Sequence, residues 1–140
     1  METIGFIGLG RIGTGMALNI NQAGHPMVVH DIDETACKSL LEKGATLGNS
    51  PAEVAAVSDV VFTSLPGPKE LDQVINGPGG LINGIKPGTV YVDLSTTYPS
   101  IYTALEPRFQ KMGVTLMDGP VLTGPKRAVQ GQTTIIVGGS

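Results

Sequence analysis

The sequence predicts an α/β fold, a doubly wound parallel sheet with helices on both faces. Short apolar runs alternate with helical patterns along the chain, the order typical of parallel sheets. Right-handed crossovers between such strands place helices on both faces. A glycine-rich turn directly follows the first apolar run, at the end of the strand where folds of this type bind ligands. The 140 residues suit one domain, residues 1–140, with one core.

The first predicted strand, residues 4–7, is followed at once by the motif G-x-G-x-x-G. Gly8 permits the tight turn, Gly10 lets the backbone approach a pyrophosphate, and Gly13 lets the next helix pack on the strand. The free N–H groups and the positive dipole end of that helix suit a diphosphate. The predicted cofactor-binding residues of this Rossmann-type turn are Gly8, Leu9, Gly10, Arg11, Ile12 and Gly13.

The residues around the motif distinguish a dinucleotide-binding site from an ordinary strand, turn and helix that binds no ligand. Apolar residues at helical spacing run from Met16 to Ala23, and Gly24 is placed to end the helix. Residues 27–30 form the second predicted strand, and Asp31 follows directly after it. Asp31 lies 21 positions after Gly10, near the roughly 20 expected for the acidic residue that holds ribose hydroxyls. The pattern therefore favours a dinucleotide site.

The next segment contains two predicted helices and a short strand. Asp33 can cap a helix over residues 34–43, in which Cys37 is expected to be a core or boundary thiol. Residues 45–47 form a short strand. Ser50 can cap a second helix that ends near Val57.

The rest of the chain continues the alternation. Strands are expected over residues 60–65, 89–93, 114–117 and 133–137. Helices are expected over residues 69–75 and 100–112. Pro107 lies inside the second of these helices, which should therefore kink or begin late. Leu81, Ile82 and Ile85 are expected to pack onto the core.

Polar clusters follow three of these strands, at residues 64–67, 93–97 and 118–120. Parallel strands bring their carboxyl ends to one edge, where open α/β sheets bind ligands. We therefore expect these clusters to face the glycine-rich turn.

Composition limits the possible functions and partners. The net charge of −3 and pI near 5.2 argue against nucleic acid as a partner. No apolar run approaches the roughly 20 residues of a membrane helix, and no basic region precedes the first apolar run, so neither a membrane partner nor a secretory signal is expected. The single cysteine excludes an internal disulfide and suits a reducing compartment, so the predicted location is cytoplasmic.

Several blocks together resemble the β-hydroxyacid dehydrogenases, which include 3-hydroxyisobutyrate dehydrogenases and 2-hydroxy-3-oxopropionate reductases. The first block is GFIGLGRIGTGMALNI, followed by AGH, over residues 5–25. Leu65-Pro66, the run KPGTVYVDLST over residues 86–96, and DGPV from residue 118 match in order and spacing. The resemblance covers the whole chain.

The resemblance implies an NAD(P)-dependent oxidoreductase that acts on a short 3-hydroxy acid or its semialdehyde. By the resemblance, Leu65 and Pro66 would flank the cofactor and Thr96 would lie near the nicotinamide ribose. The substrate-binding residues would be Ser95, Leu122, Thr123 and Gly124. The full-length protein is expected to be a homo-oligomer.

Two departures from the family pattern bear on this reading. Leu122 and Thr123 stand where the family has serine and glycine, a change that is compatible with a substrate other than the family's best-known ones. Lys126 and Arg127 either pair with a more acidic substrate or are solvated loop cations.

The family's catalytic lysine lies beyond Ser140, so the chain contains no predicted catalytic residue and is expected to be part of a longer protein. The alternative is a nicotinamide-binding or sensing module without chemistry.

Asp31 favours NAD over NADP. Its carboxylate can accept both ribose hydroxyls, whereas a 2′-phosphate would bring like charges to about 4 Å, roughly 4 kcal/mol at an effective dielectric near 20. No arginine occurs between Asp31 and Pro107 to receive that phosphate.

Overall fold

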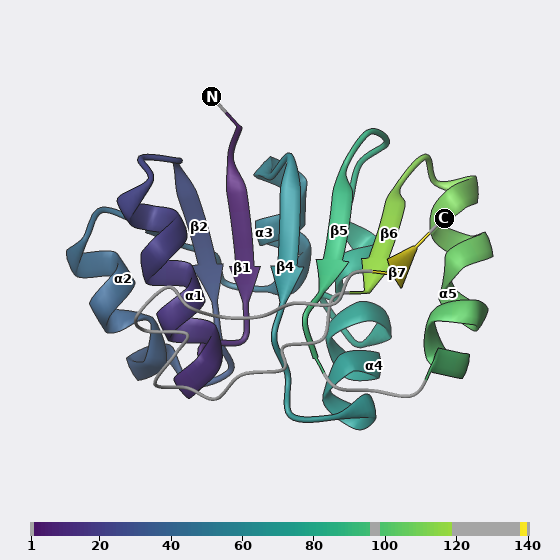
Figure 1. Ribbon diagram of the computed structural model, residues 1–140, viewed down its shortest axis with the longest axis horizontal. Coiled ribbons are helices and arrows are strands. Elements are labelled where there is room, and N and C mark those ends of the chain that lie inside the picture. Colours follow the sequence, from purple (N-terminus) through teal and green to yellow (C-terminus); the bar gives the residue numbers. More distant parts are fainter. Residues whose placement is uncertain (1, 96–98, 119–137, 140) are drawn as a thin grey trace.

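The computed structural model describes residues 2–95, 99–118 and 138–139. Its centre is a single sheet with strand order β3-β2-β1-β4-β5-β6-β7 (Figure 1). The strands are β1 (Ile4–Ile7), β2 (Met27–His30), β3 (Thr46–Leu47), β4 (Val60–Thr63), β5 (Val90–Asp93), β6 (Thr115–Asp118) and β7 (Gly138–Gly139). The predicted doubly wound α/β fold is confirmed.

The first six strands pair in parallel, and β1 lies at the middle of their order. Ile4 is in register with Met27 on one side and with Val60 on the other. The chain therefore builds outward from β1 in both directions, which creates a switch point between β1 and β4. Among the described strands, β7 alone pairs antiparallel, with Gly139 opposite Met117. The predicted last strand, residues 133–137, lies outside the described residues.

The helical elements alternate with the strands as predicted. They are α1 (Arg11–Gln22), η1 (Glu34–Cys37), α2 (Lys38–Glu42), α3 (Pro51–Val57), α4 (Pro68–Asn76), η2 (Leu81–Asn83) and α5 (Pro99–Lys111).

The single helix predicted over residues 34–43 was wrong, because it is divided into the 3-10 turn η1 and the short helix α2. The Asp33 carboxylate accepts both the backbone N–H and the hydroxyl of Thr35, at 3.0 and 2.7 Å. This tight local turn starts the segment in a narrower helical form.

Two further boundaries differ from prediction. Strand β4 ends at Thr63 rather than at residue 65, because the Leu65 N–H leaves the sheet ladder and donates to Ser95 Oγ at 2.7 Å. Helix α5 does not begin late: it starts at Pro99 and continues through Pro107. Leu105 and Phe109 are buried on either side of Pro107, and this packing holds the helix to the sheet.

Each face of the sheet has its own apolar cluster, as the alternation along β1 requires. Phe6 packs on the face covered by α1, η1 and α2, together with Ala17, Val29 and Leu40. Ile7 packs on the opposite face, covered by α3, α4 and α5. The members on that face include Val54, Val61, Leu71, Ile75, Tyr91 and Phe109. Leu81 and Ile85 are buried there as predicted, whereas Ile82 is half-buried.

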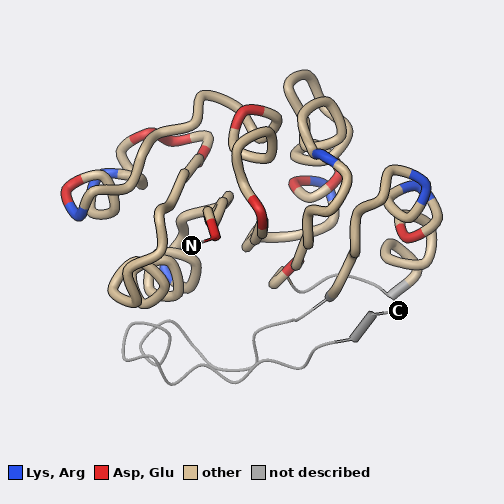
Figure 2. Tube along the Cα trace, turned by 90° about the horizontal axis from the view of Figure 1, so that it is seen from above, with Lys and Arg blue, Asp and Glu red and all other residues tan. Residues whose placement is uncertain are grey.

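Charged residues are distributed over several helices and loops of the described chain (Figure 2). Among the described residues, no helix has the length and apolar character needed to cross a membrane.

Candidate dinucleotide-binding site

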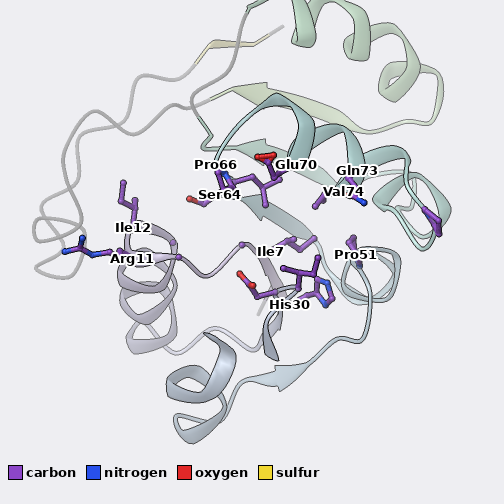
Figure 3. A pocket seen from close by; sticks show the side chains of 17 residues that line it. Ile7, Arg11, Ile12, His30, Pro51, Ser64, Pro66, Glu70, Gln73 and Val74 are labelled. Carbon is purple, nitrogen blue, oxygen red and sulfur yellow. The ribbon is translucent and has the colours of Figure 1, made fainter. Parts of the chain in front are cut away.

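A cavity of about 630 Å³ lies at the switch point, at the carboxyl ends of β1, β2 and β4 (Figure 3). Its floor is the turn after β1, its sides are the ends of β2 and β4, and one face of α4 completes the wall. The neighbouring turns are joined through the backbone, since Gly8 N–H donates to the His30 carbonyl at 3.0 Å and Ser64 N–H donates to the Ile7 carbonyl at 2.9 Å. The lining residues are Ile7, Gly8, Gly10, Arg11, Ile12, Gly13, His30, Asp31, Ile32, Pro51, Ser64, Leu65, Pro66, Glu70, Gln73, Val74 and Pro78.

The three glycines of the motif have different surroundings. Gly8 has φ +94°, and a Cβ there would lie 2.1 Å from the Ser64 carbonyl oxygen. A Cβ on Gly13 would lie 2.2 Å from the Gly8 carbonyl oxygen. These two positions are therefore required by the fold itself.

Gly10 is different, because the protein around it leaves room for a side chain. It is exposed, its φ of −70° is ordinary for any residue, and a Cβ would meet no atom within 4 Å. Packing in the described chain therefore does not require glycine at this position, and the missing side chain leaves the cavity open at the start of α1. That helix has 12 residues and begins at Arg11, so its first N–H groups and positive dipole end adjoin this open space.

Asp31 is held by the backbone on both carboxylate oxygens. Oδ2 accepts the Leu9 N–H at 2.6 Å, and Oδ1 accepts the Asp33 N–H at 2.9 Å. A carboxylate has about four lone-pair sites, so two hydroxyl donors can still be accepted. The half-buried Asp31 therefore joins the end of β2 to the glycine-rich turn and retains capacity for a ligand.

Cys37 lies behind this carboxylate and is fully buried. Burial, and next the charge of Asp31, raise the pKa of the Cys37 thiol. A neutral, enclosed thiol fits the predicted structural role.

Several cavity residues were missed by the sequence analysis. Ile32 is 94% exposed, an unusual state for an isoleucine, and offers an apolar surface beside Asp31. Glu70, Gln73 and Val74 project from α4 into the cavity (Figure 3). Their spacing of three and four residues places them on one face of a helix, and this spacing could have identified them.

A buried polar cluster joins β4, β5 and α5 beside the cavity. Thr63 Oγ1 donates to Asp93 Oδ1 at 2.7 Å, and the Tyr102 hydroxyl donates to Asp93 Oδ2 at 2.6 Å. The Ser95 N–H also donates to Asp93 Oδ1, at 3.1 Å. Because the Thr63 proton is used on Asp93, its oxygen accepts from the Tyr91 hydroxyl at 2.8 Å. Burial, and then the charge of Asp93, raise the pKa of Tyr91 well above its ordinary value.

The structure brings most predicted cofactor residues together. Gly8, Gly10, Arg11, Ile12, Gly13, Asp31, Leu65 and Pro66 all line the cavity. Leu9 does not line it, but its N–H is bonded to Asp31, which does. The Arg11 side chain extends away from Ile7 and Val74, so its backbone rather than its guanidinium faces the cavity (Figure 3).

The residues predicted to contact substrate are only partly described. Ser95 is 3% exposed, and its Oγ accepts the Leu65 N–H. Thr96, Leu122, Thr123 and Gly124, with the end of the third polar cluster, lie outside the described residues. His30 also lines the cavity, and its Nδ1 is bonded to the Gly48 carbonyl at 2.9 Å, consistent with a structural role. The described residues contain no group of three His, Cys, Asp or Glu side chains that could hold a metal.

Residues 3–140 match the family described as the NAD binding domain of 6-phosphogluconate dehydrogenase. The chain belongs to this family of NAD-binding domains. Its glycine-rich turn, its Asp31 and its switch-point cavity are thus parts of a domain whose family binds NAD.

Relatives of this NAD-binding domain include named dehydrogenases. Mouse mitochondrial 3-hydroxyisobutyrate dehydrogenase is 38% identical over 136 residues, which are 97% of this chain and 41% of that protein. The 2-(hydroxymethyl)glutarate dehydrogenase of Eubacterium barkeri is 39% identical over 137 residues, 98% of this chain and 46% of that protein. The chain therefore spans less than half the length of these relatives.

Solved structures show the same domain within larger chains. The Mycobacterium tuberculosis 3-hydroxyisobutyrate dehydrogenase with L-serine has a TM-score of 0.91 at 29% identity, and all of this chain covers 47% of it. Psf3 in complex with NADP+ and 2-OPP has a TM-score of 0.92 at 28% identity, and 98% of this chain covers 49% of it.

Proposed function

We propose that the switch-point cavity binds NAD with the diphosphate over Gly10 and the adenosine ribose on Asp31. The open space at Gly10 carries this proposal, because a Cβ built there meets no atom within 4 Å and packing in the described chain therefore does not require glycine. Two backbone N–H groups already fix the Asp31 carboxylate, so it is preorganised to accept ribose hydroxyls. Ile32 supplies an apolar surface for the adenine, and Leu65 and Pro66 flank the second nucleotide.

The same geometry favours NAD over NADP. Ribose hydroxyls can donate to Asp31, whereas a 2′-phosphate offers oxygens and negative charge to an anion. Asp33 and Glu34 follow closely and are exposed, which adds further negative charge to this end of the cavity. We therefore propose that Asp31 discriminates between NAD and NADP, and that the negative charges of Asp33 and Glu34 strengthen the preference for NAD.

The test is the ratio of the Kd values for NADPH and NADH in the parent chain and in Asp31→Ala. The parent should prefer NADH by more than about tenfold, since half of roughly 4 kcal/mol exceeds one decade. Asp31→Ala should narrow the ratio, mainly by weakening NADH. Asp33→Ala is the matched control and should change the ratio less. An unchanged ratio in Asp31→Ala removes the assignment.

We further propose that the chain is the cofactor-binding part, residues 1–140, of a longer NAD-dependent dehydrogenase. The expected reaction is reversible hydride transfer between nicotinamide and a short 3-hydroxy acid or its semialdehyde. The names of the mouse and Eubacterium relatives support this substrate class. Ser95, Thr96, Leu122, Thr123 and Gly124 are proposed to line the substrate side of the site. The general acid/base is expected to be a lysine supplied by a later part of the longer protein.

Reading the coding sequence beyond the Ser140 codon tests this second proposal. A continuation with a lysine in a glycine-rich helix start, followed by long helices, is the expected result. The full-length protein should then oxidise 3-hydroxyisobutyrate or a related acid with NAD. A continuation of unrelated character, together with binding but no turnover, would overturn the enzyme assignment and favour a sensing module.

The assembly and the compartment of the full-length protein remain predictions. We propose a homo-oligomer in the cytoplasm. Because the mouse relative is named as mitochondrial, fractionation of the native cells is the deciding measurement for the compartment.

A further inference from the structure

The Asp93 cluster, defined as Thr63, Asp93, Ser95 and Tyr102, connects three elements that the sequence keeps apart. Asp93 ends β5, Thr63 ends β4, and Tyr102 lies in the second turn of α5. The Asp93 side chain is 1% exposed and accepts three hydrogen bonds of 2.6 to 3.1 Å. Charge-assisted bonds of this kind are stronger and more directional than neutral ones.

The cluster also reaches the cavity wall. Ser95, whose N–H is held by Asp93, accepts the Leu65 N–H on its own Oγ at 2.7 Å. Leu65 lines the cavity, and this bond forms just beyond the end of β4 at Thr63. The path from α5 to the wall therefore runs from Tyr102 through Asp93 and Ser95 to Leu65.

The position of this wall relative to the cofactor follows from the topology. Asp31, on the β2 side, is at the adenosine half in the proposed binding mode. The second half of a doubly wound sheet, on the β4 to β6 side, receives the other nucleotide. Leu65 thus belongs to the nicotinamide half of the cavity.

We propose that Tyr102 and Asp93 are positioning residues. They fix the position of Leu65, which forms the cavity wall beside the nicotinamide half of the cofactor. This inference rests on the proposed function, since it requires a dinucleotide in the cavity. Neither residue lines the cavity in the described structure, so their effect passes through Ser95 and Leu65. Loss of either one loosens the nicotinamide half and leaves the adenosine half, built on Asp31 and the glycine-rich turn, unchanged.

The test compares two ligands that share the adenosine half. NADH occupies the whole cavity, whereas ADP lacks the nicotinamide nucleoside. Tyr102→Phe removes one hydroxyl from a half-buried ring and should raise the Kd for NADH roughly tenfold, the order expected for one charge-assisted hydrogen bond. The Kd for ADP should stay at the parent value. Asp93→Asn should give the same pattern with a larger change in NADH affinity.

Tyr91→Phe is the matched control. It also removes a tyrosine hydroxyl from a buried site, but that hydroxyl contacts Thr63 and not the carboxylate. It should lower the melting temperature without changing the ratio of the two Kd values. Equal weakening of NADH and ADP in Tyr102→Phe, or an NADH affinity equal to the parent's, would overturn the inference. A parent chain that binds neither ligand contradicts the proposed function instead, so the two failures are distinguishable.

Discussion

Replacing Gly10 with alanine should weaken NADH binding without weakening the fold. The backbone at Gly10 is already in a conformation that alanine adopts, and an added methyl meets no protein atom within 4 Å. Alanine restricts the unfolded chain, which contributes about 0.4–1 kcal/mol of stability, while it is a poorer N-cap residue than glycine by a similar amount. The free energy of unfolding should therefore change by less than about 1 kcal/mol.

Binding responds differently, because the methyl group occupies the space proposed for the diphosphate. Displacing the diphosphate from the first N–H groups of α1 costs at least one hydrogen bond to a charged group, about 1.5–3 kcal/mol. The Kd for NADH should rise roughly 10- to 150-fold.

Gly13→Ala provides the contrast within the same motif. Its methyl would lie 2.2 Å from the Gly8 carbonyl oxygen, so the turn must shift at a cost of about 1–3 kcal/mol in the free energy of unfolding. Thermal unfolding by circular dichroism and titration with NADH, followed by its own fluorescence, separate the two effects. The reasoning is refuted if Gly10→Ala binds NADH as the parent does, or if it loses as much stability as Gly13→Ala.

Three further predictions concern stability and reactivity. Ser50→Ala should lower the free energy of unfolding by about 1 kcal/mol in urea melts, because Ser50 Oγ accepts the Glu53 N–H at the start of α3; an exposed Thr46→Ala serves as control. Burial and the charge of Asp93 raise the pKa of Tyr91, so its hydroxyl proton is lost at a lower pH in the unfolded chain than in the folded one. The free energy of unfolding should therefore fall as the pH rises above about 10. Tyr91→Phe should make this fall with pH less steep. Cys37 should resist iodoacetamide at pH 8 and react readily in urea, whereas equal rates in both conditions contradict its burial.

Local patterns predicted the fold and the proximity of Asp31 to the glycine-rich turn. Gly8, Gly10 and Gly13 lie in one turn after β1, and Asp31 follows at a spacing fixed by α1 and β2, which together with β1 form one βαβ unit. Such a unit has few alternative arrangements, because parallel strands require a right-handed crossover. The position of Asp31 beside the glycine-rich turn therefore followed from the sequence alone.

The cavity wall at Leu65 depends on contacts between distant segments. The Leu65 N–H donates to Ser95 Oγ, a partner 30 residues later in the chain. In the structure β4 ends at Thr63 rather than at the predicted residue 65. Likewise, Tyr102 reaches Asp93 only because α5 packs against the sheet beside β6. No local periodicity identifies such partners. The division of the helix after Asp33 was missed for a different reason, since the side-chain bonds to Thr35 compete with a regular first turn.

A calorimetric titration of the 140-residue chain with NADH and, separately, with NADPH tests directly whether the switch-point cavity is a dinucleotide site. The cavity at the switch point predicts saturable binding with one NADH per chain, and Asp31 predicts weaker binding of NADPH. Absence of saturable binding of either nucleotide to the folded chain would contradict the account.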